Sequence, residues 1–130
     1  MGFVTVRPYT EISEFENLLL EESWVRGIEV RHGTLCLQLD LVLTVGHPGF
    51  TPPASGELFC YRTGEISFSG MTCLSWSEQV IRPATDAAGE IDFGHIDVFE
   101  WDSEEFRLRG DFGHINLRAR NVSVRLTRLE

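Results

Sequence analysis

A chain of 130 residues with 42% hydrophobic and 24% charged residues has the composition of one folded domain, long enough to bury a core without disulfides or metal. The formal charge of −9, from 20 acidic and 11 basic residues, argues against binding to nucleic acid or to an anionic membrane. The chain contains no lysine, which excludes Schiff-base chemistry and a P-loop lysine.

The N-terminal residues predict a short edge strand and then a helix. The strand covers residues 3–6 and ends at Pro8. Ser13 with Glu16 fits a capping box, and the apolar residues of this segment follow helical spacing: Ile12, Phe15, Leu18 and Leu19. We expect an amphipathic helix that ends near Glu22, with one face docked and with Glu14 on the acidic, solvated face.

The middle of the chain predicts two hairpins. Alternation indicates strands over residues 24–31 and 35–43, joined by a turn at His32-Gly33, and the leucines of the second strand fill one face. Residues 44–56 contain three prolines and predict a loop. The second hairpin consists of residues 58–62, a turn at Thr63-Gly64, and residues 65–76 with a bulge at Gly70. Residues 80–90 predict another loop.

An internal repeat dominates the C-terminal third, because residues 92–97 (Asp-Phe-Gly-His-Ile-Asp) return as residues 111–116 (Asp-Phe-Gly-His-Ile-Asn). Apolar residues change between odd and even positions at Gly94 and again at Gly113, which predicts a β-bulge or tight bend with positive φ at each glycine. Strands over residues 90–101, 106–111, 114–120 and 122–126 then form a meander. We expect a single domain over residues 1–130 of the α+β, mostly β class: an antiparallel meander sheet or sandwich with glycine bulges and one N-terminal amphipathic helix.

The repeat also suggests an alternative function, a β domain that binds a metal or a small ligand at the duplicated Asp-Phe-Gly-His-Ile bends. It can bring together two histidines and two carboxylates, which suit zinc or iron: His95, His114, Asp92 and Asp111. However, Asp-x-x-His in a strand bend is not an established ligand spacing, and an Asp cap followed by Gly explains a bend without metal. The main hypothesis therefore includes no cofactor.

The sequence contains no recognisable catalytic set. It has no G-x-S-x-G elbow, no activated-cysteine signature and no Ser-His-Asp order above chance. The three cysteines lack Cys-x-x-Cys spacing and suit reduced thiols: Cys36, Cys60 and Cys73. With no signal peptide and no run approaching about 18 apolar residues, we expect a cytoplasmic binding domain rather than an enzyme.

The strand around Phe99 and Trp101 is apolar on both faces, since these two residues alternate with Ile96 and Val98. Either the strand is central in a two-layer fold and buries both rings, or the two rings form an exposed patch for a partner. Together with nearby acidic residues they give the candidate partner-binding set: Phe99, Trp101, Glu100, Asp102 and Glu14. An acidic surface of this kind suits a basic protein partner.

Four patterns carry a resemblance: Leu-x-Leu-x-Leu at 35–39, Phe68-x-Gly70-Met71, Leu108-x-Gly110-Asp111-Phe112-Gly113-x-Ile115, and Val-x-Val-x-Leu at 122–126. In outline, residues 25–126 resemble a diffuse group of small uncharacterised bacterial β-rich domains, some of them immunity proteins of polymorphic toxin systems. The resemblance implies a compact acidic binder that neutralises a basic toxin. It transfers no catalytic residue to this chain.

Overall fold

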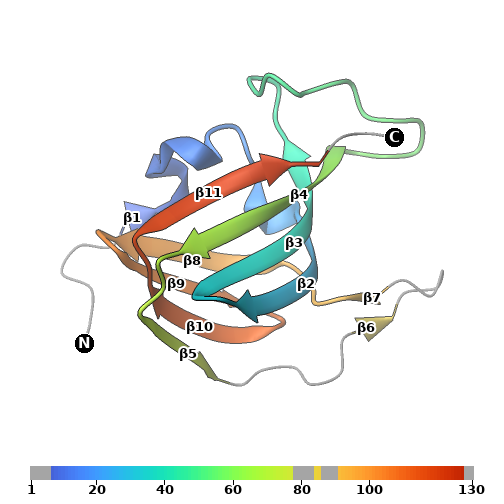
Figure 1. Ribbon diagram of the computed structural model, residues 1–130. Coiled ribbons are helices and arrows are strands. Elements are labelled where there is room, and N and C mark those ends of the chain that lie inside the picture. The colour runs from blue at the N-terminus through green and yellow to red at the C-terminus, as the bar shows by residue number, and fades with distance from the viewer. Residues whose placement is uncertain (1–6, 78–83, 86–90, 128–130) are drawn as a thin grey trace.

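The computed structural model describes residues 7–77, 84–85 and 91–127, and these form two antiparallel sheets (Figure 1). The five-stranded sheet has the order β1 (Arg7–Pro8), β8 (Ile96–Asp102), β9 (Glu105–Gly110), β10 (Gly113–Arg118), β5 (Cys73–Ser77). The four-stranded sheet has the order β11 (Asn121–Leu126), β4 (Cys60–Ser69), β3 (Thr34–Leu43), β2 (Trp24–Arg31). A small ribbon pairs β6 (Ala84–Thr85) with β7 (Ile91–Asp92). The prediction of a mostly β, antiparallel fold is confirmed.

The chain passes from one sheet to the other at two neighbouring corners, and these corners join the two layers along one edge. The chain turns from β4 into β5 at Gly70, whose φ is +64°, and from β10 into β11 at Ala119-Arg120. Backbone bonds tie the two corners together, from Arg120 N to Ser69 O at 3.0 Å and from Thr72 N to Arg118 O at 2.9 Å. The bulge expected at Gly70 within one strand over residues 65–76 is therefore wrong, because Gly70 lies at a corner between two strands of different sheets.

A second seam joins the sheets near the start of β8. Val25 N donates to Gly94 O at 2.8 Å, and Phe93 N donates to Val25 O at 2.7 Å. The glycine here has a φ of +85°, and Gly113 has a φ of +115°, so the prediction of positive φ at both repeat glycines is confirmed. The ladder irregularity itself lies between Ile96 and Val98, two residues beyond Gly94.

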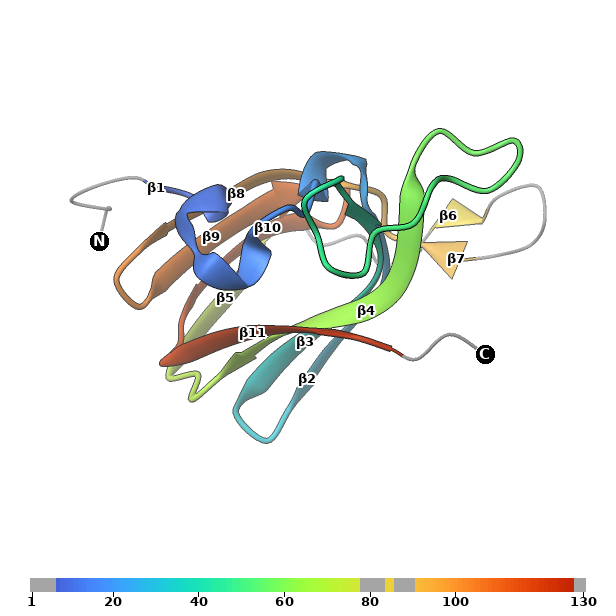
Figure 2. The same ribbon diagram turned by 90° about the horizontal axis from the view of Figure 1, so that it is seen from above.

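The core lies between the two sheets (Figure 2). The inward leucines of β3 are at most 2% exposed, as the alternation predicts. Facing them are buried side chains of β9 and β10, including Leu108 and Ile115. Five aromatic rings pack together where the N-terminal segment meets both sheets: Tyr9, Phe15, Phe68, Phe99 and Phe106.

The expected N-terminal amphipathic helix is not formed. Residues 9–22 contain three short 3₁₀ turns, η1 (Tyr9–Glu11), η2 (Ser13–Phe15) and η3 (Leu20–Glu22), and no side chain caps them. Asn17 has a φ of +63°, and extended backbone next to it pairs with the end of β3, where Leu19 N donates to Val42 O at 3.0 Å. Tertiary pairing thus outweighs a weak local helix preference. Figure 2 shows this segment between the five-stranded sheet and β11.

Two other expectations in the C-terminal two thirds are wrong. The turn expected at Thr63-Gly64 does not exist, because β4 runs through both residues and Gly64 pairs with Leu39 on one side and Leu126 on the other. The meander holds for β8, β9 and β10, but β11 leaves it and pairs with β4 in the other sheet. The expected loop over residues 44–56 is confirmed.

Some expectations fall outside the described residues. These are the strand over residues 3–6 and most of the loop over residues 80–90. In the part of the chain that the structure describes, no helix has the length and apolar character needed to cross a membrane.

Candidate partner-binding site

The structure separates the two aromatic candidates. Phe99 is 4% exposed and lies in the core, with ring centroids 5.1 Å from Phe15 and 5.8 Å from Tyr9. This is the burial expected of a strand in a two-layer fold, and it leaves the Phe99 ring no surface for a partner. Trp101, by contrast, is half-buried near the end of β8 and reaches the surface.

Trp101 contacts Arg7 and Pro8, the first described residues of the chain. Its indole Nε1–H donates to Pro8 O at 2.9 Å, and the Arg7 guanidinium lies over the ring, 5.3 Å from its centroid. The contact follows from register, because Arg7 and Trp101 are opposite each other in the β1–β8 pair and so point to the same face. Glu11 completes the group, with its carboxylate 4.0 Å from the Arg7 guanidinium. Both charged side chains are about half exposed.

A hollow of about 290 Å³ opens beside Trp101. It lies where η1 and η2 approach the β8–β9 turn and the start of β11. Its wall combines apolar and polar side chains: Glu11, Ile12, Ser13, Trp101, Ser103, Phe106, Arg120 and Val122. Phe106 and Trp101 are cross-strand neighbours, so they form a continuous aromatic floor. The hollow can accept a side chain with an apolar stem and a polar end.

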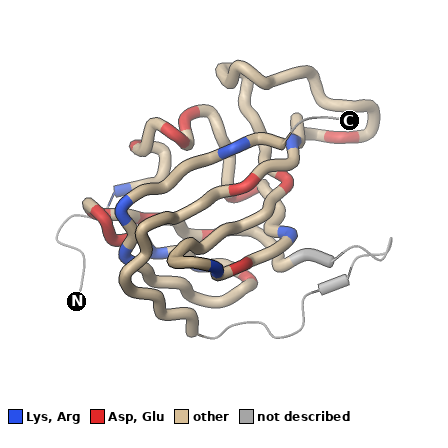
Figure 3. Tube along the Cα trace, viewed as in Figure 1, with Lys and Arg blue, Asp and Glu red and all other residues tan. Residues whose placement is uncertain are grey.

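The surroundings of this hollow are acidic. In residues 7–22 five glutamates are exposed, and Arg7 is the one basic residue among them: Glu11, Glu14, Glu16, Glu21 and Glu22 (Figure 3). The adjoining residues 102–105 carry three more carboxylates, but Glu104 and Glu105 pair with Arg118 and Asp102 points to the outer face of the sheet. Surface charges within about 8–10 Å act on a ligand together at physiological salt. Of these carboxylates, Glu11 lines the hollow itself, and Arg120 is a basic residue of the same wall.

The other predicted residues are divided between two places. Glu100 and Asp102 alternate with Trp101, so they point to the opposite, outer face of the sheet. Glu100 pairs there with Arg107 at 2.9 Å. Glu14 lies exposed in η2, next to Ser13 of the hollow wall. The structure thus brings Trp101 close to the segment that holds Glu14, and it separates these two from Glu100 and Asp102.

Tyr9 fixes the acidic segment in place. Its hydroxyl donates to Glu21 Oε1 at 2.6 Å and accepts from the backbone N–H of Leu20 at 3.1 Å. Burial is the main cause that raises the pKa of the Tyr9 hydroxyl, and the bond to the Glu21 carboxylate raises that pKa further. The phenol therefore stays protonated at neutral pH, and its two hydrogen bonds tie η1 to η3.

The metal alternative has less support from the geometry. His95 Nδ1–H donates to Ser23 O at 2.8 Å, and its ring packs on Trp24 with centroids 3.9 Å apart. His114 lies on β10 between Arg109 and Ser77. Asp111 packs against Gly94, and Asp92 belongs to β7, whose side chains are outside the described part. No group of three or more potential metal ligands occurs among the described residues.

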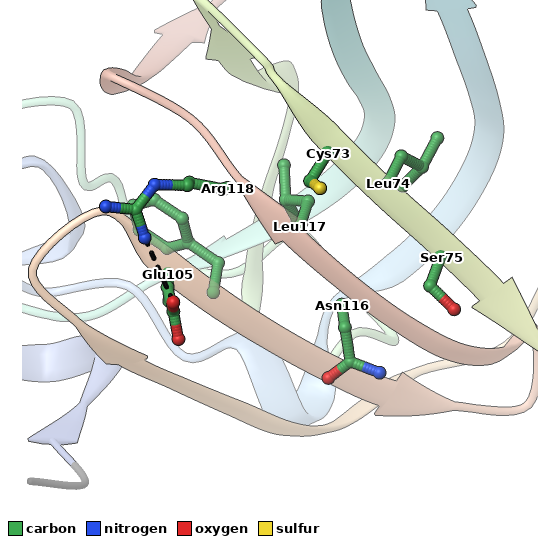
Figure 4. A pocket seen from close by; sticks show the side chains of 8 residues that line it. Cys73, Leu74, Ser75, Glu105, Asn116, Leu117 and Arg118 are labelled. Carbon is green, nitrogen blue, oxygen red and sulfur yellow. Dashed lines mark hydrogen bonds and ion pairs between the residues drawn. The ribbon is translucent and has the colours of Figure 1, made fainter. Parts of the chain in front are cut away.

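A larger hollow of about 810 Å³ lies over three neighbouring strands of the five-stranded sheet (Figure 4). Its wall comes from β5, β9 and β10: Cys73, Leu74, Ser75, Glu105, Phe106, Asn116, Leu117 and Arg118. The main charged groups are already paired, with Arg118 Nη1 at 3.0 Å from Glu105 Oε1. This hollow and the Trp101 hollow are equally open to solvent, so openness does not distinguish them as candidate sites.

No protein-family model matches the chain, and comparisons with curated proteins and with solved structures likewise find no match. Two neighbours of Trp101 have no such role in the sequence analysis. Ile12 appears there as a core position of a helix, and Arg7 is not named there. Neither has a sequence signal for this role, because both reach Trp101 through the β1–β8 pairing and the 3₁₀ turns.

Proposed function

We propose that this chain is a non-enzymatic protein-binding domain that captures a basic partner through the Trp101 hollow and the acidic segment of residues 9–22. One observation carries the proposal: an aromatic-floored hollow of about 290 Å³ lies next to a segment with five exposed glutamates. An aromatic anchor within a polar rim is the usual arrangement of a protein-binding hot spot.

Electrostatics supply long-range attraction. A net charge of −9, with five exposed glutamates in residues 9–22, steers a basic partner toward this segment and speeds association. Charges on a rim contribute little affinity individually, so the hollow must supply the short-range fit. The rigid attachment of the segment by Tyr9 reduces the ordering cost of binding.

The resemblance to immunity proteins names one kind of partner, a basic bacterial toxin. Such a partner would meet an acidic surface that excludes nucleic acid by like charge. The proposal places the domain in the cytoplasm of a bacterial cell, where an immunity protein would meet its toxin. Neutralisation would then follow from covering a basic surface of the toxin, with no chemistry performed by this chain.

The test compares two variants that each lose three negative charges. Glu14→Gln, Glu16→Gln and Glu22→Gln remove exposed carboxylates of the acidic segment, whereas Glu29→Gln, Glu57→Gln and Asp97→Asn remove exposed carboxylates elsewhere. Each protein is immobilised, exposed to a lysate of its host cell at low salt, and eluted with a salt gradient. The dissociation constant of any eluted basic protein is then measured for all three forms.

We expect the variant of the acidic segment to bind the partner about fivefold to tenfold more weakly, from three charges of modest individual effect. The distant variant should bind it like the wild type. Equal weakening in both variants would show that net charge alone matters, and it would contradict the proposed site. Capture of neutral or acidic proteins only would contradict the proposed partner class.

A further inference from the structure

We propose that the partner presents an arginine side chain to Trp101 and Glu11, and that Arg7 of this chain occupies the same two groups until the partner arrives. The inference rests on the proposed function and specifies its ligand chemistry. Arg7 lies 5.3 Å from the Trp101 ring centroid and 4.0 Å from the Glu11 carboxylate. Trp101 and Glu11 also line the hollow, so Arg7 and an arginine of the partner would contact the same two side chains.

The chemistry of the group selects arginine. A guanidinium is planar, so it stacks on an indole ring while its N–H groups bind a carboxylate at the edge. The ammonium of lysine is a compact and strongly hydrated charge that gains less from such a site. The apolar wall formed by Ile12, Phe106 and Val122 can cover the methylene stem of the incoming side chain.

Arg7 is held weakly enough to be displaced. Its side chain is 49% exposed, and its ion pair with Glu11 is at the limit of contact, where exposed pairs contribute little stability. Among the described residues, β1 pairs with β8 at two positions, Arg7 with Trp101 and Pro8 with Glu100. Displacement therefore costs mainly the cation–π contact that the incoming arginine restores.

One positive group in the wall opposes this ligand. Arg120 also lines the hollow, but the methylene groups of its side chain pack against the corner at Gly70, where a Cβ atom would lie 3.0 Å from Arg120 Cβ. Glu11 lies in the same wall and offsets this charge, and the exposed Glu14 and Glu16 follow it in the chain. Loss of Glu11 should accordingly weaken arginine binding more than loss of a distant carboxylate.

The experiment titrates the ¹⁵N-labelled protein with N-acetyl-arginine amide and follows the Trp101 indole N–H by NMR. The chain has three tryptophans, and Trp101→Phe assigns the signal. N-acetyl-lysine amide is the matched ligand control. The variants are Arg7→Ala, which frees the ring, Glu11→Gln, which removes the carboxylate, and Glu57→Gln as a distant control.

We expect saturable shifts with the arginine amide and binding at least about threefold weaker with the lysine amide. Arg7→Ala should tighten arginine binding by about twofold to fivefold, because it removes the internal competitor. Glu11→Gln should weaken it, and Glu57→Gln should leave it unchanged. Unchanged or weaker binding by the Arg7→Ala protein would overturn the competition.

Equal binding of the two amides, or no shift at the Trp101 indole, would overturn the arginine specificity. These failures are separate from failure of the proposed function. If the lysate partner still distinguishes the two charge variants while the arginine amide does not bind, partner capture stands and the arginine inference falls. Loss of both results would overturn both proposals.

Discussion

The Asp111 side chain occupies the space where a Cβ atom on Gly94 would lie. The two copies of the repeat therefore pack against each other, with one bend providing the open space that the other fills. Gly94 also has a φ of +85°, and its carbonyl accepts the seam bond from Val25. The bends of the two copies of the repeat thus meet at the seam between the two sheets.

Replacing Gly94 with alanine should strongly destabilise the protein. Positive φ alone costs about 1–2 kcal/mol for a residue with a Cβ atom, and the clash with Asp111 adds about 1–3 kcal/mol. Gly33→Ala is the matched control, because Gly33 has a φ of +71° but no atom within 4 Å of the added Cβ. Urea denaturation of both variants checks this, and equal losses would mean that the contact with Asp111 has no energetic role.

The Gly64→Ala substitution tests whether strand β4 runs through Gly64, where the sequence predicts a turn. A Cβ atom there would lie 2.7 Å from Arg125 O and 2.9 Å from Leu41 Cδ1, so we expect a loss of about 1–3 kcal/mol. The neighbouring Thr63→Ala, at an exposed position, should change stability by at most about 0.5 kcal/mol. Thermal unfolding followed by circular dichroism gives both values, and a neutral Gly64→Ala would argue for a turn.

How far sequence predicts this fold depends on whether the signal is local. The leucine alternation of β3 and the two repeat bends are written in neighbouring residues, and both were predicted. The 3₁₀ segment was mistaken for a helix because its apolar spacing suits both, and the deciding pairing with Val42 lies more than twenty positions away. Gly64 looked like a turn because the side chains that surround it belong to distant strands.

The residues of the candidate site, too, are predictable from the sequence only where the signal is local. Trp101 was chosen from its strand pattern, but nothing local distinguishes it from the buried Phe99. Alternation alone predicts that Glu100 points away from Trp101, as it does in the structure. The approach of Ile12 and Val122 depends on sheet switching at the two corners, which no local pattern encodes.

Stability should fall in alkaline solution through Tyr9. Its folded pKa is raised by burial and then by Glu21, whereas a tyrosine in the unfolded chain titrates near about 10. The associated stabilisation is fully present below that pH and is lost as pH rises toward the folded pKa. Tyr9→Phe should lower the free energy of unfolding by about 1–2 kcal/mol at neutral pH, since Leu20 N–H loses its acceptor.

The same variant should lose much of the alkaline decline, and Tyr61→Phe should keep it. Urea titrations at pH values from 7 to about 11 measure the slope, around the reference pKa. An alkaline slope identical in the wild type and the Tyr9→Phe protein would contradict the role assigned to the buried phenol.

Phe99 and Trp101 should separate stability from binding. Phe99→Ala should cost about 3–5 kcal/mol, because it opens a cavity in the aromatic cluster. Phe99→Leu should fold and bind the partner like the wild type. Trp101→Leu should weaken partner binding several-fold, since the ring contributes to the hollow wall. Partner affinity that depends equally on both residues would show that the loss comes from destabilised folding.

The most direct test of the account is the hydrogen-exchange footprint of the captured partner on this chain. Amide exchange is compared for the free and the bound protein across all peptides. We expect new protection concentrated in residues 9–22 and 101–106, around the Trp101 hollow, with little change in β2 and β3. Protection confined to the outer face of the four-stranded sheet or to the loop over residues 44–59 would contradict the proposed site.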